Sequence, residues 1–176
     1  MTLQGKTVLL FAAPYYEDLE LWYPKLRLEE EGATVVVAGL GEKSYTGKKG
    51  LTVAADMSVD DVIDEEYDAL VIPGGWAPDA MRRSEKLLRV TRDFAAAGKP
   101  VAFICHAAWV LASAGLLKGR RATCVRAIRD DVVNAGAEYV DAPVVVDGNL
   151  ISSRTPADLG AFCRALIAAL GGATPA

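Results

Sequence analysis

The chain has 176 residues, of which 52% are hydrophobic and 24% are charged, and its formal net charge is −4. A chain of this length and composition buries a substantial core, so a disordered protein is excluded. The negative charge argues against a general nucleic-acid-binding protein, which would carry a basic face. No stretch is long and apolar enough to span a bilayer. We therefore expect a globular protein without nucleic-acid or membrane partners.

The cysteine content indicates a reducing compartment. There are three cysteines, an odd number with no CxxC pair, and this pattern does not fit a disulfide framework. Free cysteines of this kind are typical of cytosolic proteins. Together with the lack of a long apolar segment, they predict a soluble, cytoplasmic protein.

Short β-branched runs alternate with longer helical patterns along the chain. Continuous apolar runs predict strands covered on both faces, at 6–13, 34–38, 68–72 and 101–104. Two short extended runs within 44–56 flank Gly47 and Gly50 and predict a hairpin-like excursion. Helical patterns occupy 18–31, 84–97, 107–114, 128–135 and 155–170, and further extended runs lie at 122–125, 144–146 and 150–152. The inner face of the first helix is expected to carry Leu19, Trp22, Leu26 and Leu28.

This alternation predicts one α/β domain over 1–170, followed by a frayed tail at 171–176. Right-handed crossovers would give a mostly parallel sheet with helices on both faces. Ligands of such sheets bind beyond the carboxyl ends of the strands. The loops 14–18 and 73–79 and the pair Cys105-His106 all follow strands, so we expect them at one edge.

Cys105 and His106 follow the apolar run 101–104 at a strand-to-helix turn, and His106 is the only histidine in the chain. A thiol is a nucleophile as the thiolate, and an imidazole or a helix N-terminus lowers its pKa from about 8.5 to roughly 3.5–7.5. Such a turn projects a nucleophile into a site. The alternative is a small buried hydrophobe, which is the interpretation that we favour for Cys124 and Cys163.

The acidic residues Glu17, Asp18 and Glu20 follow the first strand, and two interpretations of them stay open. They are ordinary acids at a helix start, favourable to its dipole, or Glu17 points across the strand ends to Cys105. A protonated carboxyl there would donate a hydrogen bond to the thiolate.

The sequence Pro73-Gly74-Gly75 is either a simple strand-ending turn or part of an oxyanion hole. In the second case, the backbone N–H groups of Gly75 and His106 point at a developing oxyanion. A single histidine leaves too few nitrogen ligands for a zinc site, and Gly39-Leu40-Gly41 lacks the third glycine of a dinucleotide fingerprint. We therefore expect neither a metal nor another cofactor. The basic cluster of Lys118, Arg120 and Arg121, followed by Arg126 and Arg129, is typical of a solvated face.

Several motifs, in this order, resemble the PfpI family of intracellular cysteine peptidases, within the superfamily of the parkinsonism-associated deglycase. The resemblance covers nearly the whole chain. It is carried by these segments: Glu17-Asp18-Leu19-Glu20-Leu21, Val71-Ile72-Pro73-Gly74-Gly75, Ala77-Pro78-Asp79, Gly98-Lys99-Pro100-Val101-Ala102, Ile104-Cys105-His106, Asp130-Asp131, Asn134-Ala135-Gly136-Ala137-Glu138, Val145-Val146-Asp147-Gly148-Asn149-Leu150 and Ser152-Ser153-Arg154.

The resemblance implies a flavodoxin-like three-layer sandwich and a role for each matching residue. Cys105 resembles the nucleophile, His106 the residue that assists it, and Glu17 the glutamate beneath the thiol. Asp79 falls where relatives place an acid that reaches the histidine of a neighbouring subunit. Gly75 and His106 match the oxyanion-hole amides. A homodimer or a higher homo-oligomer is therefore expected.

Two features depart from the family or are unusual. Relatives continue Cys-His with Gly-Pro, whereas this chain has Ala107-Ala108, and alanine resists a positive φ. Trp76 and Trp109 are bulky, and we expect both near the mouth of the site, where they narrow it against peptides.

These residues predict a thiol-dependent stress-response enzyme that acts on small reactive carbonyls or their adducts, in the manner of a glyoxalase or a deglycase. Peptide hydrolysis through an acyl-enzyme at Cys105 is the alternative enzymatic activity. A third possibility is a redox sensor or chaperone-like protein, because a stabilised thiolate is also prone to oxidation.

Overall fold

A computed structural model of the chain describes residues 2–171. Its main sheet has seven strands in the order β10-β11-β7-β6-β1-β2-β5. The strands span β1 Thr7–Phe11, β2 Thr34–Gly39, β5 Met57–Ser58, β6 Ala69–Ile72, β7 Val101–Ile104, β10 Val144–Asp147 and β11 Leu150–Ser153. Only the pair β10 and β11 is antiparallel, and the other pairs are parallel. The expected mostly parallel sheet is therefore confirmed.

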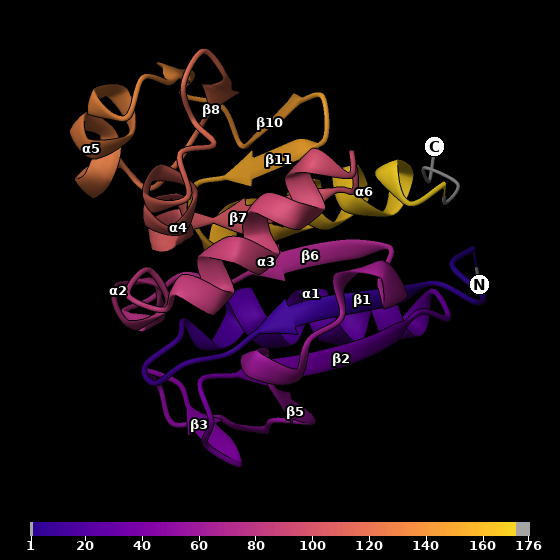
Figure 1. Cartoon of the computed structure of the whole chain (residues 1–176). Coiled ribbons are helices and arrows are strands. Elements are labelled where there is room, and N and C mark those ends of the chain that lie inside the picture. The colour runs from indigo at the N-terminus through magenta and orange to yellow at the C-terminus, as the bar shows by residue number, and fades with distance from the viewer. Residues whose placement is uncertain (1, 172–176) are drawn as a thin grey trace.

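Helices cover both faces of this sheet and complete a flavodoxin-like sandwich. In Figure 1, α3 crosses in front of the sheet, and α1 and α6 lie behind it. The helices span α1 Asp18–Glu30, α2 Ala77–Met81, α3 Glu85–Ala96, α4 Ala108–Ser113, α5 Arg129–Asn134 and α6 Leu159–Ala169. The central strands β6 and β7 are buried along their whole length, as expected for continuous apolar runs between two helical layers.

Short elements complete the chain. The strands β3 Ser44–Thr46 and β4 Thr52–Ala54 form the expected antiparallel hairpin, and β8 Arg121–Ala122 pairs with β9 Glu138–Tyr139. The 3₁₀ turns span η1 Val59–Asp61, η2 Asp64–Glu66, η3 Cys105–Ala107, η4 Arg126–Ile128 and η5 Pro156–Asp158. Of the expected tail at 171–176, all but Gly171 lies outside the described residues.

Two sequence predictions about local structure are wrong. The segment expected as a loop at 73–79 contains the start of α2, which has Pro78 within its first turn, where the missing N–H of proline costs nothing. In α1, Leu19 and Leu26 are 53% and 57% exposed, although both were expected inside. The buried side chains of α1 are Asp18, Glu20, Leu21, Pro24 and Leu28. The inner face therefore includes two carboxylates.

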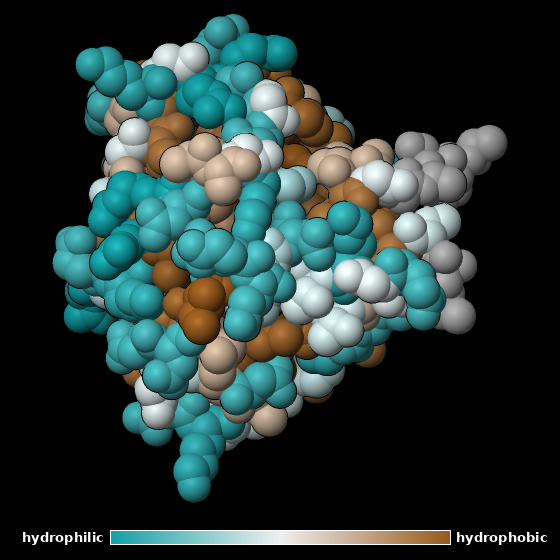
Figure 2. Space-filling model, turned by 45° about the vertical axis from the view of Figure 1, so that its right-hand side comes forward, coloured by the Kyte–Doolittle hydropathy of each residue, from teal (hydrophilic) through white to brown (hydrophobic). Residues whose placement is uncertain are grey.

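The surface is mostly hydrophilic on the face drawn in Figure 2, with scattered apolar side chains between the polar ones. Within residues 2–171, no helix has the length and hydropathy that a membrane span needs.

Candidate active site

Cys105 lies on a strained turn at the carboxyl end of β7. Its φ is 63°, in the left-handed region that residues with a side chain rarely adopt. The strand ends at Ile104 and η3 begins at Cys105, so the turn redirects the chain within one residue. Ala107 and Ala108, which follow His106, have φ values of −60° and −57°. Alanine therefore meets no strain at the two positions where the family resemblance led us to expect Gly-Pro.

The backbone N–H groups of Gly75 and His106 face the sulfur of Cys105 and lower the pKa of its thiol. Gly75 has a φ of 80°, and a Cβ on it would lie 2.6 Å from the carbonyl oxygen of Tyr15. This position therefore requires glycine. The structure brings together the two amides that the sequence pointed to, and they provide donors where a negative charge on sulfur or on a substrate oxygen would develop.

The carboxyl group beside Cys105 belongs to Glu20. Its Oε2 accepts a hydrogen bond from the N–H of Gly74 at 2.8 Å, and the group lies close enough to the Cys105 thiol for each to shift the pKa of the other. Gly74 separates these two side chains: a Cβ there would collide with Glu20 Oε2 and lie 2.7 Å from the Cys105 Cβ. Glu20 is fully buried, and its Oε1 has no nitrogen or oxygen partner among the described residues. This geometry suits a carboxyl whose proton points to the sulfur.

The prediction that Glu17 is the carboxyl beneath the thiol is therefore wrong in geometry. Glu17 is the N-cap of α1, and its Oε2 accepts a hydrogen bond from the N–H of Glu20 at 3.0 Å. A cap side chain folds back onto its own helix and cannot also reach the sheet edge. Glu20, one turn further, shares the inner face with Pro24 and Leu28. If Pro24 and Leu28 are taken to mark the inner face of this helix, the same face includes Glu20 and not Glu17.

The ionisation of Glu20 and the ionisation of Cys105, which are both buried, are coupled. Burial, reinforced by the negative charge of Glu17, raises the pKa of Glu20 to about 8. Burial and the charge of an ionised Glu20 likewise raise the pKa of the Cys105 thiol, while the N–H groups of His106 and Gly75 lower it. At neutral pH, Glu20 keeps its proton, so no carboxylate charge opposes ionisation of the thiol.

His106 stands beside the thiol and between two tryptophans. Its Nδ1 lies 3.3 Å from Cys105 Sγ. The ring centroids of Trp76 and Trp109 lie 5.9 and 5.2 Å from that of His106, so both tryptophans flank the site as expected. Burial and the positive charge of Lys48 lower the pKa of His106. The imidazole is therefore neutral at pH 7 and can accept a proton.

Lys48 is a site residue that the sequence analysis missed. It lies in the hairpin turn, where its N–H donates to the carbonyl of Tyr16, and its Nζ lies 6.0 Å from the centre of the Trp76 ring. Asp18 holds this turn in place by accepting from the N–H groups of Lys49 and Leu51, at 2.7 and 2.8 Å. The sequence carries no signal for Lys48, because the burial of Asp18, which makes that carboxylate need partners, is seen only in the structure.

Asp79 does not meet His106 within one chain. It lies on α2 with a side chain that is 65% exposed, and its nearest recorded partner is Arg83, at 3.5 Å. Cys124 and Cys163 are free and buried, as expected. Within residues 2–171, no three His, Cys, Asp or Glu side chains are grouped so as to hold a metal ion.

The fold and the site together define an α/β protein with a cysteine at a nucleophile elbow. The chain belongs to the DJ-1/PfpI family, whose sequence model matches residues 6–169. It is 52% identical over 160 residues to "Deglycase TK1284" of Thermococcus kodakarensis, covering 91% of this chain and 96% of that protein. It is 41% identical over 170 residues to "General stress protein 18" of Bacillus subtilis, covering 94% and 98%.

A solved structure from Anabaena variabilis, a protein with DJ-1/ThiJ/PfpI-like and ferritin-like domains, has a TM-score of 0.93 and 44% identity to this chain. The match covers 96% of this chain but 49% of that one, so this chain spans about half of the two-domain protein.

Proposed function

We propose that this protein is a cysteine-dependent stress enzyme of the deglycase type, which acts on reactive carbonyls or their adducts in the cytoplasm. The name of the Thermococcus relative supports the activity, and that of the Bacillus relative supports the role in stress. One observation carries the proposal. Three chain segments bring together a thiol, a buried carboxyl that keeps its proton to about pH 8, a neutral imidazole and two amide donors.

In this reaction, the Cys105 thiolate attacks the aldehyde carbon of methylglyoxal. A C–S bond forms, and the carbonyl electron pair moves to the oxygen, where the N–H groups of Gly75 and His106 stabilise it. The product of this step is a hemithioacetal. An adduct has a carbinol carbon in place of the aldehyde; there the thiolate forms the same C–S bond as the bond to the amine or thiol breaks, and the leaving group takes up a proton.

His106 then moves the proton of the first carbon to the neighbouring carbonyl through an enediol, which yields a lactoyl thioester. Water hydrolyses this thioester to lactate and regenerates the thiol. No oxidant or reductant is consumed, because one carbon is oxidised as its neighbour is reduced.

Two substrates offered to the reduced protein distinguish this activity from peptide hydrolysis. The proposal predicts lactate from a methylglyoxal–thiol adduct and negligible cleavage of a fluorogenic peptide, because Trp76 and Trp109 narrow the entrance. Rapid peptide cleavage without lactate would contradict it and favour the peptidase alternative.

We also propose that the working form is a homodimer or higher oligomer in which Asp79 orients His106 of a neighbouring subunit. His106 has no carboxylate partner among residues 2–171 of its own chain. The exposed face of α1 carries an apolar stripe of Leu19, Tyr23 and Leu26 that a second copy would cover.

Mixing two inactive variants tests this shared site. Cys105→Ala and Asp79→Asn should each have little activity, and subunit exchange between them should restore part of it. A protein that stays monomeric and fully active, or mixtures that never recover activity, would contradict the shared site.

A further inference from the structure

A cavity of about 680 Å³ lies beside the candidate active site, although neither Cys105 nor His106 lines it. Its walls include Arg126, Arg129, Tyr139, Arg154 and Thr155. The parallel register between β11 and β7 pairs Ser153 with Ile104, so Arg154 and Cys105 follow at the same level on adjacent strand ends. Neighbouring strands are about 4.8 Å apart. The cavity therefore begins one strand away from the thiol.

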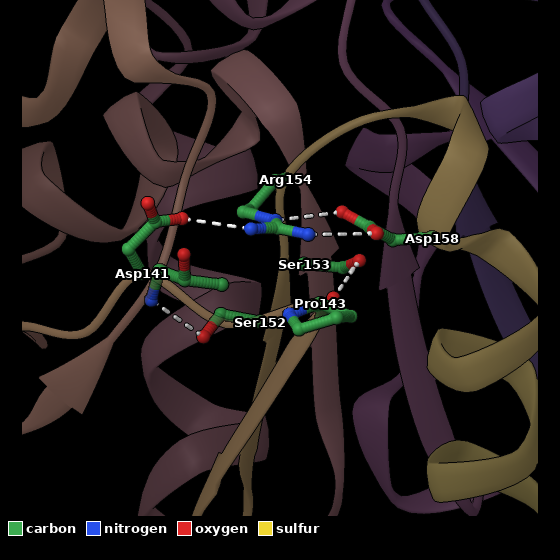
Figure 3. Close-up of polar contacts among 7 residues, drawn as sticks. Asp141, Pro143, Ser152, Ser153, Arg154 and Asp158 are labelled. Carbon is green, nitrogen blue, oxygen red and sulfur yellow. Dashed lines mark hydrogen bonds and ion pairs between the residues drawn. The ribbon is translucent and has the colours of Figure 1, made fainter.

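One of the three arginines has its charge neutralised within the cavity wall. Figure 3 shows Arg154 held between two carboxylates. Its Nε and Nη2 donate to Asp158 at 2.9 and 3.1 Å, and its Nη1 donates to Asp141 at 2.8 Å. These are the two carboxylates that line the cavity. They are thus already occupied by Arg154, which acts as a fixed structural element.

The other two arginines carry uncompensated charge into the same space. Among residues 2–171, the guanidinium groups of Arg126 and Arg129 have no ion pair and no hydrogen bond. Arg129 stacks on Tyr139, with its Cζ 5.5 Å from the ring centre, which fixes its position without neutralising it. Three arginines and two aspartates leave the lining with a net charge of +1. A guanidinium recognises carboxylates and phosphates by paired hydrogen bonds.

The cavity wall is also joined to the active site. Trp109 packs against His106, and its Nε1 donates to Asp131 at 2.8 Å. Asp131 lies on α5, the helix that begins at Arg129. Cavities of about 300–1,000 Å³ hold molecules much larger than methylglyoxal. The space therefore fits the remainder of an adduct whose carbonyl carbon is at Cys105.

We propose that Arg126 and Arg129 form a subsite for the anionic group, a carboxylate or a phosphate monoester, of a glycated substrate. The inference rests on the proposed function, because it names the class of adduct that the same thiol attacks. Substrates with a free acid near the glycated group are then preferred over neutral ones.

Binding to the Cys105→Ser variant tests the subsite without turnover. Inorganic phosphate and N-acetylglycine are the anionic probes, and N-acetylglycinamide is the neutral control, each followed by calorimetric titration. Arg126→Gln/Arg129→Gln should lose about tenfold in affinity. Both residues are exposed, so this double variant should fold normally. The matched control, Arg89→Gln/Arg164→Gln, removes the same charge from exposed positions outside the cavity.

Saturable binding of phosphate alone identifies a phosphate monoester as the anionic group, and binding of N-acetylglycine alone identifies a carboxylate. No saturable binding of either probe, or an equal loss in the control variant, would overturn the subsite.

Kinetics provide a second measurement. Methylglyoxal adducts of N-acetylcysteine and of its neutral amide differ only in the carboxylate. Arg126→Gln/Arg129→Gln should raise KM for the acid about tenfold and leave KM for the amide unchanged. If the wild type converts neither adduct, the proposed function fails and the binding titration still decides the subsite. If it converts both and no anion binds, the subsite alone fails.

Discussion

At the scale of single residues, reactivity depends on which member of the Glu20–Cys105 pair carries the negative charge. Burial disfavours the charged form of both groups, and they cannot both ionise at low cost. The N–H groups of Gly75 and His106 favour a negative charge on the sulfur, whereas Glu20 accepts from the Gly74 N–H and has one oxygen without a hydrogen-bond partner. These amides partly offset the burial that raises the pKa of the Cys105 thiol, and a protonated Glu20 adds no charge that opposes the thiolate.

Glu20→Gln tests this balance, because glutamine keeps the shape of the side chain and cannot ionise. Above the pKa of Glu20, the wild-type carboxylate opposes the thiolate, so the loss of this charge in Glu20→Gln should lower the pKa of Cys105. The rate of alkylation by iodoacetamide as a function of pH measures this pKa. Glu17→Gln is the control and should leave it nearly unchanged. An unaltered pKa in Glu20→Gln would show that Glu20 has no influence on the thiol.

Gly75 and Gly98 are a matched pair for testing the turn beside the thiol. Their φ values are 80° and 71°, so alanine is strained by a similar amount at both. A Cβ at Gly98 meets nothing within 4 Å, whereas at Gly75 it collides with the backbone of Tyr15, Tyr16 and Glu17. Gly75→Ala should therefore destabilise the protein by more than Gly98→Ala, which costs about 1 kcal/mol, and should slow alkylation of Cys105. Equal urea midpoints for the two variants would contradict this packing.

At the scale of elements, α1 shows what the sequence could and could not predict. Its bounds were predicted within one residue, because the acidic start and Gly32 mark both ends. Its phase was wrong, because Leu19, Trp22 and Leu26 suggest an apolar face while the buried face includes Asp18 and Glu20. Carboxylates are rarely buried, so the two acidic residues made the buried face of α1 look like a solvent-exposed one. The prediction of Glu17 in place of Glu20 rested on its position after the first strand and on the family resemblance, and the wrong phase gave no reason to correct it.

The cap at the start of α1 yields a prediction that separates Glu17 from the chemistry. Glu17→Ala removes the acceptor for the Glu20 N–H and should cost about 1 kcal/mol of folding free energy. Glu17→Asn restores a cap and should recover most of that loss. Urea denaturation measures both values. Neither variant should slow alkylation of Cys105 as strongly as Gly75→Ala does. If Glu17→Asn slowed alkylation as much as Gly75→Ala, Glu17 would have a direct role at the thiol.

At the scale of the whole molecule, the β-branched runs and the alternation with helices were enough to predict the parallel sheet and the edge where the loops meet. The convergence of Cys105, Gly75 and His106 followed from that topology. Lys48 could not be predicted in this way, since it enters from the hairpin outside the main sheet. The cavity lined by Arg126 and Arg129 could not be predicted either, because a run of basic residues looks the same in sequence whether it is solvated or faces a cavity.

The buried carboxyl also makes the stability of the whole protein depend on pH. The pKa of Glu20 is about 8 in the folded protein and 4.5 when the side chain is free, so the folded state holds a proton that the unfolded state releases. The resulting stability is fully present below about pH 4.5 and is lost as the pH rises through about 8. Within this window, each pH unit costs up to about 1.4 kcal/mol.

Glu20→Gln should flatten this dependence, because its amide does not titrate. Urea midpoints measured from about pH 5 to about pH 8 should fall more steeply in the wild type than in the variant. Parallel curves would show that Glu20 keeps its ordinary pKa in the folded protein.

The most direct test of the account is the release of lactate from a methylglyoxal adduct by three proteins in parallel: the reduced wild type, Cys105→Ala and Cys163→Ala. Cys163 is free and buried like Cys105, but it lies on α6. The account predicts lactate from the wild type and from Cys163→Ala, and none above the uncatalysed rate from Cys105→Ala. Undiminished lactate release by Cys105→Ala would contradict the assignment of the nucleophile, and with it the proposed mechanism.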